Sequence, residues 1–340
     1  MTEAPILAPI LSVQHLSVRF HTYAGIVQAV RDVSFSLRKG EVLAIVGESG
    51  SGKSVTAQAI LGLIELPGKV THGEIRWKGH SLLGPEGARL AGRIRGKELA
   101  VVFQDPMTSL NPLFPVKTQI GEVLRRHLGM SRKQAHERVV ELLELVGVAS
   151  PRRRADQYPH ELSGGMRQRV MIAMALACEP ELLIADEPTT ALDVTIQAQI
   201  LELIAELQQR LQLAVLLITH DLGVVAGVCH RVAVMYGGKI VETGSAPELF
   251  RRPGHPYTAG LLSSTPRLDL VQHRLSGIEG VPPELLDPPP GCPYEPRCPL
   301  AVEQCAEMPP LADYDGREVA CWRAFATTDG APAGARSLPG

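Results

Sequence analysis

The stretch from Gly47 to Ser54 reads Gly-Glu-Ser-Gly-Ser-Gly-Lys-Ser, and it constrains this chain more than any other segment does. It fits the pattern G-x-x-x-x-G-K-[ST], in which glycines let backbone N–H groups turn inward around a phosphate chain. An apolar run at 42–46 precedes it and a helix-compatible run at 55–61 follows. This strand–loop–helix order favours a phosphate-binding loop (P-loop) over a Gly/Ser-rich loop that matches by chance, because a helix N-terminus attracts anions.

Each polar group of this loop has a predicted task in holding a nucleoside triphosphate. The Lys53 ammonium is expected to reach the β- and γ-phosphates, and the Ser54 hydroxyl to ligate Mg²⁺. The backbone of the glycines and serines would surround the phosphate oxygens. The nucleotide-binding residues predicted here are Gly47, Ser49, Gly50, Ser51, Gly52, Lys53 and Ser54.

Composition narrows the classes of protein that this chain can belong to. Its 340 residues are 45% apolar, enough for a sizeable core, and the formal net charge of −2 gives no support to nucleic-acid binding. The N-terminus lacks the basic segment of a signal peptide, and apolar runs such as 213–218 are too short to cross a bilayer. We therefore expect an intracellular protein that reaches a membrane only through a partner.

The order of apolar and helical segments predicts an α/β fold with a mostly parallel core sheet. Short buried strands are expected at 42–46, 99–103, 182–185 and 214–219, and a hairpin turning at Gly237-Gly238. Residues 11–37 read as an N-terminal antiparallel β region. Residues from about 106 to 178 read as a helical insert, in which the Ser131 capping box begins a helix.

Four polar residues follow apolar strands directly, at the carboxyl ends where open α/β sheets bind ligands. Asp186 is expected to hold Mg²⁺ together with Ser54, and Glu187 to accept a proton from the attacking water. Gln104 is expected to orient that water or to ligate Mg²⁺. His220 is expected to hydrogen-bond the γ-phosphate.

Residues 162–169, Leu-Ser-Gly-Gly-Met-Arg-Gln-Arg, resemble the signature motif of the ABC ATPases. The P-loop, a Q-loop at Gln104, the acidic strand end at 182–187, a D-loop at 191–193 and a switch histidine at His220 follow in that family's order. The resemblance implies that two subunits sandwich ATP, each completing the other's site. The residues that it assigns in trans are Ser163, Gly164, Gly165 and Gln168, with Asp193 in the D-loop. It also implies an aromatic stacked on adenine, for which Tyr23 is the first choice and Phe20 the alternative.

A narrower resemblance covers residues 10–325. Asn111-Pro112, 220–226, 255–258 and 291–299 are similar to the ATP-binding subunits of dipeptide/oligopeptide importers. That family implies a peripheral protein on the cytoplasmic face of the cell membrane, under two transmembrane permease subunits. A second related ATPase or a second copy would lie beside it, and an extracytoplasmic binding protein would deliver the peptide. Nickel and some sugars are alternative substrates.

The resemblance divides the chain into three parts. Residues 10–245 would form the nucleotide-binding domain, with the helical subdomain at about 106–178 inside it. Residues 246–325 would form a C-terminal region of the oligopeptide-transporter type, and residues 327–340 a disordered tail.

Four of the six cysteines, Cys292, Cys298, Cys305 and Cys321, fall within one segment with the spacing C-x5-C-x6-C-x15-C. This spacing matches neither a zinc ribbon nor a common ferredoxin run. In an intracellular chain such clustering suggests a metal site, either Zn²⁺ or a [4Fe–4S] cluster, with free thiols as a third reading. The family resemblance favours the cluster.

Two rival functions fit the sequence less well. A soluble ABC protein acting on nucleic acid usually carries two cassettes or long coiled coils, whereas this chain has one cassette and no basic excess. A non-catalytic ABC subunit would require a defective acidic strand end or signature, and Glu187 and Ser163 are both present.

Overall fold

A computed structural model describes residues 8–190, 192–264 and 277–326. The chain divides into two compact units. The first unit comprises Met1–Leu11, Ser36–Val42 and Arg76–Ile218, and the second comprises Ser12–Phe35, Leu43–Ile75 and Thr219–Gly340. The predicted disordered tail at 327–340 lies outside the described residues.

The core of the first unit is a parallel sheet in the order β8-β7-β6. Its strands are β6 (Leu99–Val102), β7 (Leu182–Asp186) and β8 (Ala214–Thr219). Leu99 pairs with Leu182, and Leu182 with Ala214. β7 and β8 are buried along their whole length, as expected of parallel strands that are covered on both faces.

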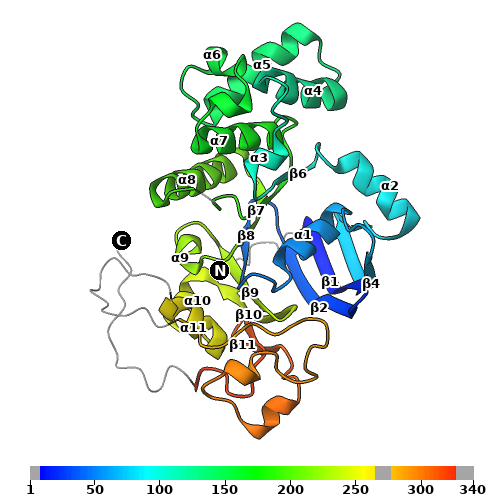
Figure 1. Ribbon diagram of the computed structural model, residues 1–340, viewed down its shortest axis with the longest axis vertical. Coiled ribbons are helices and arrows are strands. Elements are labelled where there is room, and N and C mark those ends of the chain that lie inside the picture. The colour runs from blue at the N-terminus through cyan, green and yellow to red at the C-terminus, as the bar shows by residue number, and fades with distance from the viewer. Residues whose placement is uncertain (1–7, 191, 265–276, 327–340) are drawn as a thin grey trace, which may run out of the picture. The chain divides into compact units, whose positions relative to one another are not determined.

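The rest of the first unit is mainly helical, and the helices between β6 and β7 confirm the predicted insert (Figure 1). They are α3 (Pro106–Ser109), α4 (Val116–Leu128), α5 (Arg132–Leu145), α6 (Pro151–Ala155), η1 (Pro159–Glu161) and α7 (Gly164–Ala175). Ser131 and Gln134 form the predicted capping box at the start of α5. The long helix after β7 is α8 (Val194–Leu211). Helix α2 (Gly84–Ile94) was not predicted, because three glycines and a proline obscure its periodicity.

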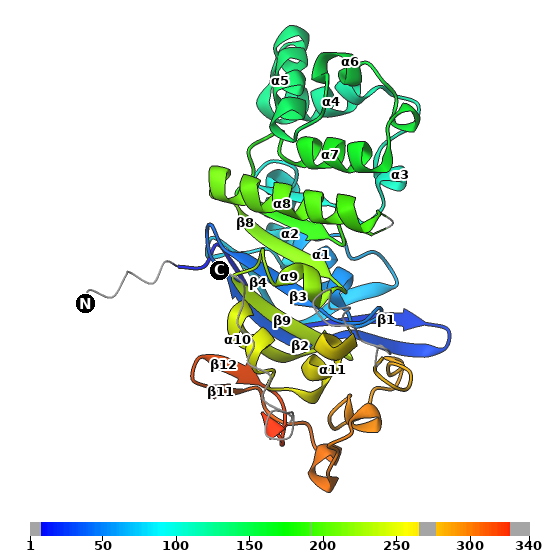
Figure 2. The ribbon, with the colours of Figure 1, turned by 90° about the vertical axis from the view of Figure 1, so that its left-hand side faces the viewer.

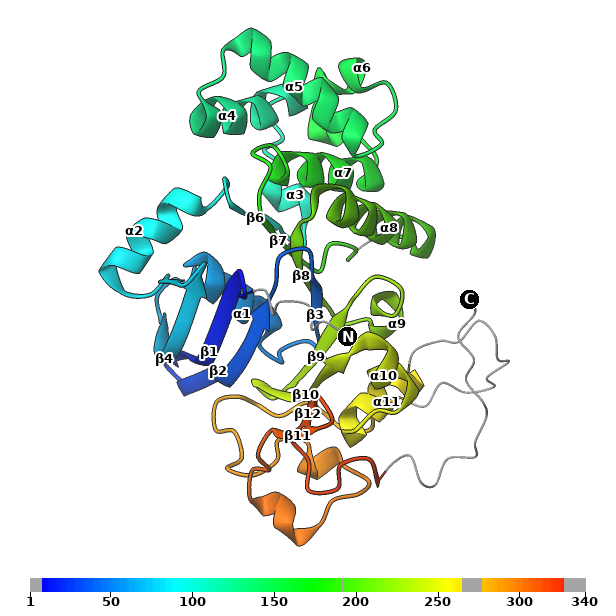
Figure 3. The same cartoon turned by 180° about the vertical axis from the view of Figure 1, so that it is seen from behind.

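The N-terminal β region of the second unit contains three long strands in the order β2-β1-β4, which lie side by side in Figure 3. They are β1 (Leu11–Thr22), β2 (Gly25–Leu37) and β4 (Gly68–Trp77), and a short strand β5 (His80–Ser81) pairs with the end of β4. A two-residue turn joins β1 to β2 and makes them antiparallel, as predicted.

The second sheet segment of this unit carries the P-loop and has the order β11-β12-β10-β9-β3. β3 (Val42–Val46) runs parallel to β9 (Arg231–Tyr236), and β9 turns through Gly237-Gly238 into β10 (Lys239–Ser245). β12 (Arg317–Val319) pairs with β10, and β11 (Ala312–Tyr314) pairs with β12, so the two short strands extend this sheet. They lie next to each other in Figure 2. The short helices are α1 (Lys53–Leu61), α9 (Leu222–Val225), α10 (Ala246–Arg251), α11 (Pro256–Ser264), η2 (Glu295–Arg297) and η3 (Glu303–Ala306).

Among the helices that the structure describes, none has the length and apolar character needed to cross a bilayer.

A buried ion pair holds β12 of the second unit to β10. The Glu242 side chain is fully buried, and its carboxylate lies 2.6 Å from Nη2 of Arg317. The same carboxylate accepts hydrogen bonds from the backbone N–H groups of Gly254 and His255, both at 2.8 Å. A buried charge with a cation and two backbone donors has its hydrogen-bonding needs met.

We predict that replacing Arg317 with Ala lowers the free energy of unfolding by about 3–5 kcal/mol, because the Glu242 carboxylate then loses its cation inside the protein. Urea titration followed by circular dichroism measures this quantity. The control is Arg138→Ala, which removes more exposed ion pairs with Glu141 and Glu179 and should cost less than about 1 kcal/mol. Equal losses in the two variants would contradict a special role for the buried pair.

Candidate functional site

The P-loop backbone packs so closely on neighbouring strands that only glycine fits at two positions. A Cβ on Gly47 would lie 2.1 Å from the Met235 carbonyl oxygen, and one on Gly52 would lie 2.3 Å from the Ala29 carbonyl oxygen. Gly52 also adopts φ 101° as the N-cap of α1, a conformation that side chains disfavour. The glycines predicted from the motif are therefore required by geometry at these two positions.

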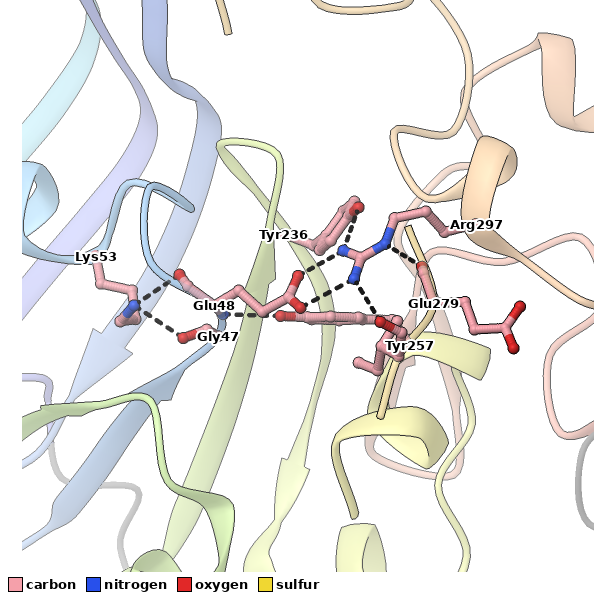
Figure 4. A network of polar contacts seen from close by, with 8 residues as sticks. Gly47, Glu48, Lys53, Tyr236, Tyr257, Glu279 and Arg297 are labelled. Atoms are coloured by element: carbon pink, nitrogen blue, oxygen red, sulfur yellow. Dashed lines mark hydrogen bonds and ion pairs between the residues drawn. The ribbon is translucent and has the colours of Figure 1, made fainter. Parts of the chain in front are cut away.

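The P-loop contains a buried lysine and a buried serine. Lys53 is only 4% exposed, and its Nζ donates to the carbonyl oxygens of Gly47 at 2.8 Å and Glu48 at 2.9 Å (Figure 4). The Ser51 hydroxyl is buried and has no hydrogen-bond partner among the described residues. Ser49 and Gly50 are exposed and Ser54 is half-buried. The loop thus has a buried cation and an unpaired hydroxyl beside exposed backbone.

In the first unit, the structure brings Gln104 and Glu187 together. Nε2 of Gln104 donates to Oε2 of Glu187 at 3.0 Å, and the Thr190 hydroxyl donates to the same oxygen at 2.9 Å. Thr190 was not predicted; its position three residues after Glu187 is the signal that could have found it. Two donors on one oxygen fix the direction in which the Glu187 carboxylate points.

The backbone at Glu187 is constrained as well. Asp186 ends β7 and is 8% exposed. Glu187 has φ 46°, in the left-handed region, and its N–H donates to the Ile218 carbonyl oxygen at 2.8 Å. A non-glycine residue in this region stores strain, which often occurs at functional sites.

The predicted signature residues lie at the start of α7, and Ser163 is its N-cap. The Ser163 hydroxyl accepts a hydrogen bond from the Met166 N–H at 3.3 Å, and Ser163 and Gly164 are exposed. A Cβ on Gly165 would lie 2.9 Å from Cγ2 of Ile196 in α8, so this glycine permits close helix packing. The Gln168 side chain is buried, with 1% exposed.

The remaining predicted residues occupy turns and caps. Asp193 of the D-loop caps α8 by accepting from the Ile196 N–H at 3.0 Å, whereas Ala191 lies outside the described residues. His220 is exposed at the end of β8. Tyr23 is fully exposed in the β1–β2 turn, whereas Phe20 is half-buried against Gly68, where a Cβ would come within 2.5 Å of its ring.

The predicted iron–sulfur or zinc site is not supported and must be corrected. Among the residues that the structure describes, no group of three or more His, Cys, Asp or Glu side chains is arranged to hold a metal ion. Desolvation by burial raises the pKa of the Cys298 thiol, and it raises the pKa values of the Cys292 and Cys321 thiols to about 11. Cys292, Cys298, Cys305 and Cys321 are all free cysteines.

The chain matches two families. Residues 30–190 match the family described as ABC transporter, and residues 241–305 match the Oligopeptide/dipeptide transporter, C-terminal region. It is 56% identical over 316 residues to the dipeptide transport ATP-binding protein DppD of Bacillus subtilis (strain 168), covering 92% of this chain and 94% of that protein. It is 51% identical over 325 residues to the oligopeptide transport ATP-binding protein OppD of Salmonella typhimurium, covering 95% and 96%.

A solved structure supports the fold assignment. The ATP-binding cassette MJ0796, a dimer in a post-hydrolysis state bound to ADP and Pi, superposes with a TM-score of 0.61 at 28% identity. The match covers 69% of this chain and 98% of that one. Because identity to the curated relatives exceeds half over nearly the whole chain, the chain belongs to the ABC transporter family, among its dipeptide and oligopeptide transport ATP-binding proteins.

Proposed function

We propose that this chain is the ATP-hydrolysing subunit that powers import of dipeptides or oligopeptides through an ABC transporter. One observation carries the enzymatic part: Glu187 is held by Gln104 and Thr190 at the end of β7, in a chain that also carries an intact P-loop. The importer part is supported by the names of the relatives and by the match of the C-terminal region. Uptake of nickel or another solute is the alternative outcome that the experiments below distinguish.

The P-loop residues are proposed to bind the phosphate chain of ATP. Lys53 would exchange its contacts with the Gly47 and Glu48 carbonyl oxygens for phosphate oxygens, which are stronger partners for an ammonium. The unpaired Ser51 hydroxyl would gain a partner in the same way. Backbone N–H groups of Ser49, Gly50 and Gly52 would complete the phosphate cradle, and the exposed Tyr23 ring would stack on adenine.

The catalytic step is assigned to Glu187 acting on water. Its carboxylate would accept the proton of the attacking water while the Gln104 amide keeps the carboxylate in place. His220 would hydrogen-bond the γ-phosphate. The oxygens of Ser54, Gln104 and Asp186 suit Mg²⁺, which supplies charge neutralisation to phosphoryl transfer when it is bound.

The start of α7 is proposed to complete the ATP site of a facing subunit, which is either a second related ATPase or a second copy of this chain. Exposed Ser163 and Gly164 leave N–H donors of the helix N-terminus available to an anion. Gly165 lets α7 pack on α8, and the buried Gln168 would hold the helix rather than contact nucleotide directly. Asp193 of the D-loop caps α8 and would hold this loop at the start of that helix.

Two transmembrane permease subunits are the proposed membrane partners, with a binding protein acting on their far side. The first unit has a surface groove lined by Pro112, Leu113, Arg153, Asp156, Gln157, Tyr158, His160 and Glu161. Leu113 is 77% exposed and Phe114 is 50% exposed, so apolar surface is available there for a permease helix. This contact would place the chain on the cytoplasmic face of the cell membrane.

We predict that Glu187→Gln reduces ATP turnover by roughly 10²- to 10⁴-fold, because the amide cannot accept a proton from water. ATP-bound dimers should accumulate, since binding does not require the carboxylate. Phosphate release and size-exclusion chromatography in MgATP measure the two effects. The control is Glu181→Gln, which alters only the ion pair with Lys78. Undiminished turnover would refute the role of Glu187 as base.

Leu113→Asp should reduce peptide uptake strongly while ATP binding by the isolated subunit stays at the wild-type level, because a charge in the groove opposes an apolar partner. Co-purification with the permeases measures the contact itself. Leu128→Asp, at another exposed apolar position of the helical insert, is the control. Normal uptake and normal co-purification of the Leu113 variant would remove the proposed docking site.

Deleting the gene should abolish uptake of a radiolabelled dipeptide, and a wild-type copy should restore it. A Lys53→Ala copy should not restore uptake, because the ammonium that binds the phosphates is missing. Normal dipeptide uptake in the deletion strain, together with lost nickel or sugar uptake, would reassign the substrate.

A further inference from the structure

The guanidinium of Arg297, in η2 of the C-terminal region, uses all of its N–H donors in the second unit. Nη1 donates to Oε2 of Glu48 at 2.6 Å and to the Tyr236 hydroxyl at 3.0 Å. Nη2 donates to Oε1 of Glu48 at 3.1 Å and to the Ile278 carbonyl oxygen at 3.2 Å, and Nε donates to the Glu279 carbonyl oxygen at 2.8 Å. The Arg297 side chain is 5% exposed. Five hydrogen bonds satisfy the full donor capacity of an arginine.

The acidic partner in this contact belongs to the P-loop itself. Glu48 follows Gly47 directly, and its carboxylate receives the bidentate fork of Arg297, as Figure 4 shows. Its backbone N–H donates to the Tyr257 hydroxyl at 2.8 Å, and its carbonyl oxygen accepts from Nζ of Lys53 at 2.9 Å. The side chain, N–H and carbonyl of one loop residue are thus each held by a separate group.

The surroundings make this contact rigid. The rings of Tyr236 and Tyr257 lie 4.4 Å apart, and each lies within 5.3 Å of the Tyr294 ring. Tyr294 and Arg297 come from the C-terminal region, whereas Tyr236 ends β9 beside the P-loop. A packed aromatic cluster resists rearrangement, so it keeps both hydroxyls where Arg297 and Glu48 need them.

We propose that Arg297 is a positioning residue for the P-loop, which sets ATP affinity by holding the Glu48 backbone through its side chain. The proposal rests on the proposed function, because it assigns the P-loop to ATP. With the Glu48 side chain and backbone N–H both held, the backbone of the loop is already ordered before ATP binds, and ATP binding does not have to order this part of the loop. Preorganisation of this kind lowers the cost of binding. No contact with the reacting atoms is involved, so Arg297 is expected to affect binding of ATP rather than the hydrolytic step.

The test is equilibrium binding of MgATP to the full chain, together with KM and kcat for hydrolysis. Arg297→Gln should raise the Kd and KM for ATP about tenfold and leave kcat nearly unchanged, as loss of uniform binding predicts. Arg297→Lys should raise them less, since a lysine keeps the charge but loses the fork. Glu48→Gln should match Arg297→Gln, and the double variant should be no weaker than either single variant, because both remove one interaction.

Arg317→Lys is the matched control, because Arg317 is also a buried arginine of the C-terminal region but pairs with Glu242 of β10. It should leave Kd and KM at the wild-type values. Thermal unfolding of every variant separates loss of fold from loss of affinity. Additive effects in the double variant, or equal effects of the two lysine substitutions, would overturn the positioning role. Failure of the wild-type chain to bind MgATP would instead remove the proposed function, and this inference with it.

Discussion

The close approach of the P-loop backbone to two strands is the constraint on which the second unit depends. Gly47 lies against the Met235 carbonyl of β9 and Gly52 against the Ala29 carbonyl of β2. The Gly238 N–H in the β9–β10 turn donates to the Ser51 carbonyl oxygen at 3.1 Å. The conformation of the loop is therefore set by strands that are distant in sequence. The main contribution of its own glycines is that they have no side chain to clash with those strands. Its polar groups can stay oriented toward a ligand because the packing, not the ligand, sets the backbone.

The backbone at Glu187, after the end of β7, is also held in a fixed conformation, but by hydrogen bonds rather than by close packing of glycines. Here a non-glycine residue adopts φ 46°, which costs about 1–3 kcal/mol and must be balanced by surrounding contacts. The contacts are the N–H bond to Ile218 and the two donors, Gln104 and Thr190, on the carboxylate. Strain and hydrogen bonding together leave Glu187 with one well-defined orientation, which is what a base acting on a single water requires.

Strands and motifs could be predicted because their signals are local. The apolar runs at 42–46, 182–185 and 214–219 became buried strands, and the Ser131 capping box began α5 as expected. Long-range pairing could not be predicted in this way. β11 and β12 are three residues each. They are strands only because β12 pairs with β10 and β11 pairs with β12.

The same limit applies to the candidate site and to the cysteines. Spacing identified Gln104 and Glu187 as candidates, but their hydrogen bond follows from the parallel pairing of β6 with β7. Cysteine spacing suggested a metal site in the C-terminal region, yet spacing does not say whether the side chains are arranged to hold a metal ion. No group of three or more such side chains is so arranged among the described residues. The contact of Arg297 with Glu48 joins residues 249 positions apart, so no window of the sequence contains it.

The C-terminal region is rich in loops, and two buried arginines anchor it to different parts of the second unit. Arg317 pairs with Glu242 on β10, which is a fixed part of the scaffold. Arg297 pairs with Glu48 in the P-loop, which is proposed to bind nucleotide. An anchor on scaffold stabilises the region whether or not ligand is bound. An anchor on a ligand-binding loop couples two equilibria: formation of the anchoring contact and binding of the ligand. A contact that favours the binding-competent loop must itself be strengthened by ligand to the same extent. In the proposed role of Arg297, it is therefore the position of Glu48 within the P-loop, rather than the strength of its ion pair, that would make the C-terminal region a participant in nucleotide binding.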